Sequence, residues 1–267
     1  MKKFGIVMMF FGLIGMIFTA KSFFAHQTID DEQSYPSEHV NEIVISSNYA
    51  NVEILPTNSD DINITLKGYT KNHNERTVSH LVTLNENAGK LVVDANKSWF
   101  LNISFFNFKL HEREDLIIHL PKKHYELINI KNDVGKTVVK DMTVEQLTVE
   151  NSVANMNLEN VQAKVIDVEN NVGNITLKNN TGKIFAENDL GNISVIIDEI
   201  NNDMTFIANV GKISLTVPTI PDDTTFKANT SLGSVQIFGE SGSVINKGAN
   251  YIISMTTDIG NISVEER

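Results

Sequence analysis

The chain has 267 residues, with 22 basic and 33 acidic side chains, a formal net charge of −11 at pH 7 and no cysteine. This length suits one large domain or two small ones. The lack of cysteine excludes disulfides, thiolate metal sites and a cysteine nucleophile, and the acidic balance opposes nonspecific binding to nucleic acid or to anionic lipid.

Residues 1–25 predict a membrane anchor. Two lysines precede an uncharged, largely apolar run at 4–20, and this run has the minimum length for a helix that spans a bilayer, about 17–25 residues. A cleaved signal peptide is the alternative, but Ala20 and Ala25 each follow a phenylalanine two positions earlier, where a cleavage site needs a small residue. We therefore expect a single-pass helix in the cell membrane, with a cytoplasmic N-terminus and an extracellular C-terminal domain.

Residues 26–38 are polar and acidic and include a proline, which is typical of a linker that holds a domain away from the membrane. Between residues 39 and 125, short apolar stretches alternate with polar residues and are bounded by Asn, Asp and Gly. This period of two predicts β-strands, because alternate side chains of a strand point to opposite faces. We expect 39–125 to form an irregular N-terminal β part.

The stretch SWFLNISFFNFKL (98–110) is the most aromatic part of the chain. Because the ends of a stacked fold need covering, the simplest interpretation is a cap or plug over the apolar end of the stack. The alternative is an exposed contact with the bilayer or with a partner protein. The candidate contact residues are Trp99, Phe100, Phe105, Phe106 and Phe108.

Residues 126–267 repeat one phrase: an aliphatic residue, Gly or Ala, a small polar residue or Lys, a strand residue, any residue and a second aliphatic. The copies are VGKTVV (134–139), VANMNL (153–158), VGNITL (172–177), LGNISV (190–195), VGKISL (210–215), LGSVQI (232–237) and IGNISV (259–264). A period near 19 residues predicts an all-β fold, a right-handed parallel β-solenoid with strands stacked about 4.8 Å apart. Fainter copies at 49–54 (YANVEI) and 88–93 (AGKLVV) place the first rungs near residue 40.

The phrase describes a corner of each rung. Asn stands three positions before the small residue in four successive copies, and Asn side chains can hydrogen-bond to the rungs above and below. Gly at the pivot allows a positive φ or a close approach of two coils. We expect two inward aliphatic columns, one at 134, 153, 172, 190, 210, 232 and 259 and one at 158, 177, 195, 215, 237 and 264.

No pattern predicts a metal site. All seven His residues precede the regular stack, and none has the spacing of a metal-binding helix. Asp133, Asp189 and Asp258 occupy equivalent corners, but they are too far apart to chelate one calcium ion. We expect them to be solvated turn acids, and we expect no metal and no cofactor.

A carbohydrate-active enzyme built on a β-helix would need clustered carboxylates, or basic residues that neutralise an acidic sugar. After residue 125 the chain has no His, and its first Arg is Arg267. We therefore expect no catalytic residues and no enzymatic activity.

The stretch LIIHLPKKHYELINIKNDVGKTVV (116–139), followed by repeats such as NDLGNISV (188–195), resembles a bacterial envelope domain named "putative adhesin". It is similar in particular to the LiaG-like membrane-anchored proteins of Gram-positive bacteria. The resemblance covers about residues 40–267 and includes the anchor. It implies a β-solenoid-like domain of unknown function at the cell envelope and an association with envelope stress systems.

The sequence therefore favours a non-catalytic, membrane-anchored envelope protein, an interaction or sensory scaffold linked to envelope stress. Its expected partners are the membrane, through the anchor, and an envelope protein or the cell wall, but no nucleic acid. An adhesin or a module that binds cell-wall polysaccharide is the alternative, and a carbohydrate-active enzyme is the third candidate.

Overall fold

The structure is a computed structural model that describes residues 27–70, 77–85, 88–96, 114–242, 244–246 and 250–267. The predicted anchor at 1–25 and the aromatic segment at 98–110 lie outside these residues. Across the described ranges, no helix has both the length and the apolar character that crossing a membrane requires.

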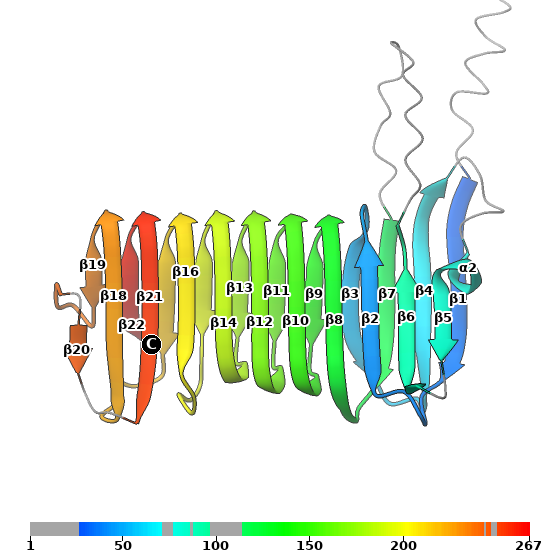
Figure 1. The fold of residues 1–267 in the computed structure, drawn as a ribbon, viewed down its shortest axis with the longest axis horizontal. Coiled ribbons are helices and arrows are strands. Elements are labelled where there is room, and N and C mark those ends of the chain that lie inside the picture. Colours follow the sequence, from blue (N-terminus) through cyan, green and yellow to red (C-terminus); the bar gives the residue numbers. More distant parts are fainter. Residues whose placement is uncertain (1–26, 71–76, 86–87, 97–113, 243, 247–249) are drawn as a thin grey trace, which may run out of the picture.

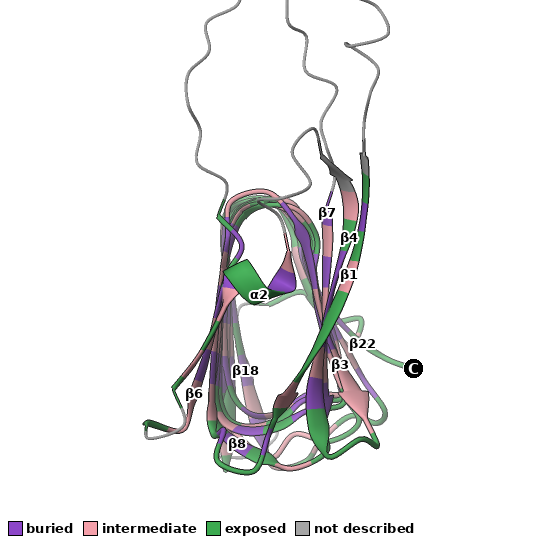
Figure 2. Ribbon diagram, turned by 90° about the vertical axis from the view of Figure 1, so that its right-hand side faces the viewer, coloured by how far each residue is buried: buried purple, intermediate pink, exposed green. Residues whose placement is uncertain are grey.

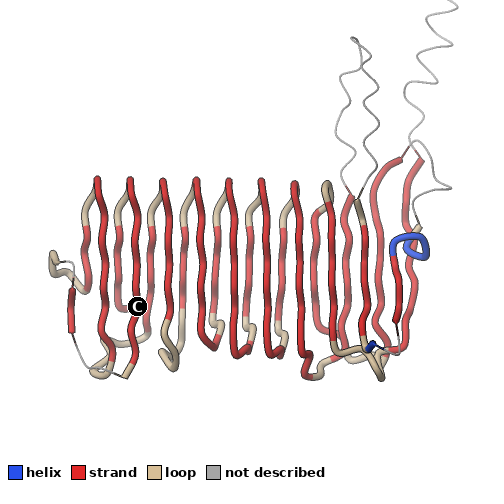
Figure 3. Tube along the Cα trace, in the orientation of Figure 1, coloured by secondary structure: helices blue, strands red, loops and turns tan. Residues whose placement is uncertain are grey.

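The described chain winds into two facing β-sheets (Figure 1, Figure 3). Sheet I has the order β1 (Gln27–Pro36), β4 (Asp61–Thr70), β7 (Glu114–Pro121), β3 (Asn51–Thr57), β9 (Thr137–Lys140), β11 (Met156–Glu159), β13 (Ile175–Lys178), β15 (Ile193–Ile196), β17 (Ile213–Val217), β22 (Ile262–Glu266) and β19 (Val235–Ile237). Sheet II has the order β20 (Val244–Asn246), β18 (Thr224–Leu232), β21 (Tyr251–Ile259), β16 (Met204–Val210), β14 (Thr181–Leu190), β12 (Gln162–Val172), β10 (Thr143–Val153), β8 (His124–Val134), β2 (Glu42–Ser47), β6 (Lys90–Asp94) and β5 (Val82–Asn85).

Each rung consists of one strand of sheet II, a tight corner and one strand of sheet I. Successive rungs pair in parallel, so that Asn151 lies between Asn132 and Asn170 in sheet II, and Leu158 lies between Val139 and Leu177 in sheet I. The predicted all-β, solenoid-like fold is confirmed, whereas the hand of the coil stays a prediction.

The rungs do not stack in chain order at either end. Strands β21 and β22 lie between β16/β17 and β18/β19, and strands β2 and β3 lie between β6/β7 and β8/β9. The corner at 259 therefore lies between the corners at 210 and 232. Equivalent repeats present equivalent strand edges, so local sequence does not decide which rung pairs with which.

The polar stretch at 26–38 is mostly not a linker. Residues 27–36 form strand β1, which pairs antiparallel with β4 over its whole length. Ile29 is 1% exposed, and Tyr35 is partly buried and packs against the core. At the same end of the stack, the short helix α2 (Val78–Leu81) places Val78 and Leu81 in the core, and Figure 2 shows α2 at the opening between the sheets.

One apolar core runs through both the irregular and the regular part of the chain. The second predicted column is buried as expected: Leu158, Leu177, Val195, Leu215, Ile237 and Val264 are each at most 1% exposed. Because the inner faces of the sheets meet along the whole stack, the sequence boundary at 125/126 does not divide the core.

The pivot glycines stack directly upon one another. At Gly191, φ is +139°, and a Cβ atom added there would overlap the carbonyl oxygen of Gly173 in the adjacent rung. Ala154 occupies the same pivot without a positive φ, and beside it the bond from Gly135 N–H to Val153 O is 3.3 Å long, against 2.9 Å for the bond from Gly173 N–H to Leu190 O. The fainter copy at 49–54 is such a corner, but the copy at 88–93 is not, because the carbonyl of Gly89 accepts from the N–H of Asn41 instead.

We predict that Gly191→Ala destabilises the fold by about 2 kcal/mol or more, because it combines a forbidden backbone angle with a backbone overlap. Urea unfolding followed by circular dichroism measures the loss. Gly242→Ala is the control, since a Cβ there meets nothing within 4 Å. Equal stability of the two variants would contradict the stacking constraint.

Candidate functional site

The corner that follows each strand of sheet II forms a continuous edge, which we call the glycine edge. Inside it runs a ladder of buried amides: Asn132, Asn151, Asn170 and Asn188 are at most 5% exposed. Asn188 Nδ2 donates to the carbonyl of Gly173 at 2.8 Å, and Asn170 Nδ2 donates to Asn188 Oδ1 at 3.0 Å. Asn132 Nδ2 likewise donates to the carbonyls of Ala50 and Gly135 at 3.0 Å, so the ladder satisfies corner carbonyls that would otherwise lack a partner.

A second amide ladder lies on the outside of the same edge, directly after the pivot. The side-chain oxygens of Asn155, Asn174 and Asn192 each accept the backbone N–H of the equivalent residue in the next rung, at 2.9–3.0 Å. This bond explains why the phrase places a small polar residue after the glycine. The two ladders together hold the edge in one conformation.

The first predicted aliphatic column does not point inward. Its members are 40–67% exposed and form a ridge along the glycine edge, in the spatial order Val134, Val153, Val172, Leu190, Val210, Ile259 and Leu232. Strand alternation would place each of them inside, but the chain turns at the glycine, and the buried place at the corner belongs to the Asn two positions earlier. We call these seven residues the aliphatic ridge.

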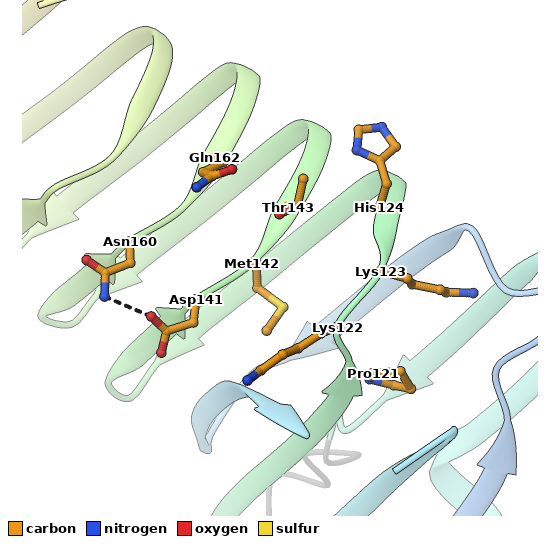
Figure 4. Close-up of a pocket in the computed structure, with 9 residues that line it drawn as sticks. All are labelled: Pro121, Lys122, Lys123, His124, Asp141, Met142, Thr143, Asn160 and Gln162. Atoms are coloured by element: carbon orange, nitrogen blue, oxygen red, sulfur yellow. Dashed lines mark hydrogen bonds between the residues drawn. The ribbon is translucent and has the colours of Figure 1, made fainter. Parts of the chain in front are cut away.

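A pocket of about 490 Å³ lies at the opposite edge of the stack, where strands of sheet I lead back into sheet II (Figure 4). The corners of three successive rungs line it: Pro121, Lys122, Lys123 and His124, then Asp141, Met142 and Thr143, then Asn160 and Gln162. The pocket is therefore open, and residues at the corners and at the adjoining strand ends line it.

The ionisable groups of this pocket do not converge on one point. His124 Nε2 lies 2.9 Å from Glu145 Oε1, and Lys123 Nζ donates to the carbonyl of Ser37 at 2.5 Å. Burial lowers the pKa of Lys123. Lys122 makes no hydrogen bond or ion pair with the described residues, so the pocket offers one available cation and amide groups, and its histidine is already paired with Glu145.

A line of carboxylates crosses the outer face of sheet II. Glu150, Glu169 and Glu187 are in register on neighbouring strands, and Asp167 lies beside them. Burial and then the charge of Glu150 raise the pKa of Asp167, and burial, Asp167 and the two flanking glutamates raise that of Glu169. Within the described ranges no three His, Cys, Asp or Glu side chains are placed to hold a metal ion.

The outer face of sheet I carries a different column. Its central positions hold small polar residues in register, namely Asn157, Thr176, Ser194, Ser214 and Ser263. The first four are half-buried, and their side chains make no hydrogen bond to any described part of the chain. We call this set the hydroxyl column, and it offers aligned donors and acceptors to a ligand.

The aromatic residues predicted as a partner contact, Trp99, Phe100, Phe105, Phe106 and Phe108, lie outside the described residues. The aliphatic ridge and the hydroxyl column are features that sequence reasoning missed. The exposure of the ridge could have been inferred from the repeated phrase. In four copies the aliphatic residue stands between an Asn two positions earlier and the pivot directly after it, so it lies at the turn and not inside a strand.

A comparison with protein family models shows which family this chain is related to. A family model described as Toastrack DUF4097 matches residues 40–137 and, in a second match, residues 126–265. The chain belongs to the Toastrack DUF4097 family. This membership confirms the predicted resemblance to an envelope domain family of unknown function, and the finer LiaG-like relationship stays a prediction. No curated protein matches the chain.

Three solved structures are similar to this Toastrack chain at low identity. A "putative cell adhesion protein" from Clostridium sporogenes is 10% identical, with a TM-score of 0.41, and the alignment covers 90% of this chain and 100% of the other. A "putative adhesin" from Bacteroides fragilis is 14% identical, with a TM-score of 0.44 and coverage of 89% and 97%. One from Parabacteroides merdae is 13% identical, with a TM-score of 0.38 and coverage of 90% and 96%.

We predict that Asn188→Ala destabilises the Toastrack fold by about 1–3 kcal/mol, because it leaves the buried carbonyl of Gly173 and the amide of Asn170 without a partner. Chemical unfolding provides the measurement. Asn171→Ala removes an exposed amide of the same edge and should change stability little. If both variants unfold alike, the buried ladder contributes nothing specific.

A second prediction concerns pH. Because the pKa of Asp167 is raised in the folded state, the fold favours the protonated carboxyl. This stabilisation is fully present below the pKa of the unfolded chain and is lost as the pH rises through the pKa of the folded state. Asp167→Asn should therefore be more stable than the parent at pH 7, by less than about 1 kcal/mol because solvent screens the site, and equal to it in acid. Thermal unfolding between pH 3 and pH 7 tests this, with exposed Asp222→Asn as the charge-matched control. A parent more stable than Asp167→Asn at pH 7 would contradict the sign.

Proposed function

We propose that this Toastrack protein is a non-catalytic interaction scaffold of the cell envelope, anchored in the membrane by residues 1–25. The hydroxyl column carries the proposal. Its polar groups lie on a sheet that parallel hydrogen bonds and two amide ladders hold in place, and they have no partner among the described residues. A preorganised polar face of this kind loses little conformational freedom when it binds.

The ionic side chains of the same sheet support a binding role rather than chemistry. Glu159 lies between Lys178 and Lys140, at 2.6 Å and 3.1 Å, and its hydrogen bonds to both lysines lower its pKa. Glu159 thus shares its charge between the two lysines. The resemblance to LiaG-like proteins supports membrane-embedded stress-signalling proteins as the partners.

Photocrosslinking tests the scaffold. A photoreactive residue at Ser194, in the hydroxyl column, is expected to capture the same envelope protein as one at Ser214 when the full chain is in its native membrane. Lys183, exposed on the outer face of sheet II, is the control position and should not capture it. Recovery of no envelope protein from either column position would contradict the scaffold.

The alternative function is the binding of cell-wall polysaccharide. The same column favours it, because hydroxyl and amide groups repeated about every 4.8 Å can hydrogen-bond to a repeating polymer. Retention of the full chain on purified cell wall, lost in Ser194→Lys and kept in Lys183→Ser, would favour this alternative over the protein partner.

A further inference from the structure

The end of the described chain that leads to the predicted anchor lies at the glycine edge. Strand β1 begins at Gln27, which pairs with Thr70 at the end of β4. The same end of β4 pairs with the start of β7, through Gly68 and Glu114. The start of β7 pairs in turn with the start of β3, just after the Ala50 pivot. Figure 1 and Figure 2 both show β1 beginning at the edge where the strands of sheet II end. Residues 1–26 therefore join the fold on the side that carries the aliphatic ridge.

The connection between the anchor and this edge is short. Since residues 27–36 belong to β1, only residues 21–26 separate the apolar run at 4–20 from the folded domain. Six extended residues span at most about 22 Å. An anchor in the bilayer thus keeps the β1 end of the glycine edge near the headgroups. If the rest of the edge also lies on the bilayer, the two sheet faces are directed sideways.

The ridge itself has the form of a line. Seven aliphatic side chains about 4.8 Å apart make a strip about 29 Å long and one residue wide. Such a strip offers roughly 300 Å², well below the approximately 800 Å² per partner of a stable protein interface. A second copy of the chain on this strip alone is therefore disfavoured.

The charges beside the ridge do not favour a charged partner. One flanking column contains Asp133, Asp189 and Asp258, and the other contains Lys136 and Lys212. The edge is thus nearly neutral within a chain of net charge −11. A nearly neutral edge with a continuous apolar crest suits the interface of a bilayer, into which apolar side chains can insert without a basic patch.

We propose that the aliphatic ridge contacts the lipid surface, so that the solenoid lies along the membrane with its glycine edge toward the bilayer. This inference rests on the proposed membrane anchoring and adds the orientation of the domain. The hydroxyl column and the carboxylates of sheet II then face along the membrane plane, where neighbouring envelope proteins can reach them.

Site-directed spin labelling tests the proposal cleanly, because the chain has no native cysteine. The full chain is reconstituted in phosphatidylcholine vesicles with a nitroxide at Leu190→Cys or, as the control on the same strand β14, at Lys183→Cys. The Leu190 label should be more accessible to oxygen than to a water-soluble nickel complex, and the Lys183 label should show the reverse. Val172→Cys and Val210→Cys repeat the ridge measurement if Leu190→Cys does not fold.

The outcomes separate the orientation from the anchoring. If the chain does not float with the vesicles, the anchoring is wrong and the orientation with it. If it floats but ridge and control labels are equally accessible to nickel, only the orientation is overturned. A ridge label shielded from both reagents would show a protein contact and would also overturn the lipid assignment.

Discussion

The close stacking of the pivot residues is the constraint on which the rest of this structure depends. The carbonyl of Gly173 occupies the space that a Cβ atom of Gly191 would need, so a pivot with this positive φ can approach its neighbour to the spacing of a parallel ladder only as glycine. Once that approach is made, both amide ladders come into hydrogen-bond range, and the strands on either side are placed in register. Ala50 and Ala154 stand at the same position of the stack without a positive φ.

The sequence predicted the fold class well and the corner poorly. Period-two alternation holds inside each strand, which is why Leu158 and Leu177 are buried as expected. At the corner the alternation ends: Asn170 takes the inner position and Val172, two residues later, is 40% exposed. At a turn the backbone direction, and not the period of two, decides whether a side chain points inward. Hydrophobicity alone therefore predicted an inward orientation for the ridge residues, which are in fact exposed.

The long-range features were also beyond local reasoning. Polar composition made residues 27–36 look like a linker, although the edge strand β1 places only Ile29 and Tyr35 against the core. The hydroxyl column was missed because its members are spread over five repeats and stand at the least restricted position of the phrase. Register, which places Ser194 beside Thr176 and Ser214, becomes visible only in three dimensions.

The interleaved rungs have a consequence for how this protein is made. Strands β18 and β19 are synthesised before β21 and β22, yet they pair in parallel with those later strands and not with β16 and β17. A chain emerging from its N-terminus therefore cannot complete the stack one rung at a time. Residues 251–266 insert between strands made before them. Until they are synthesised, β16 and β17 present an unpaired edge, and β18 and β19 have no parallel partner. Completion of the stack is thus coupled to the synthesis of residues 251–266.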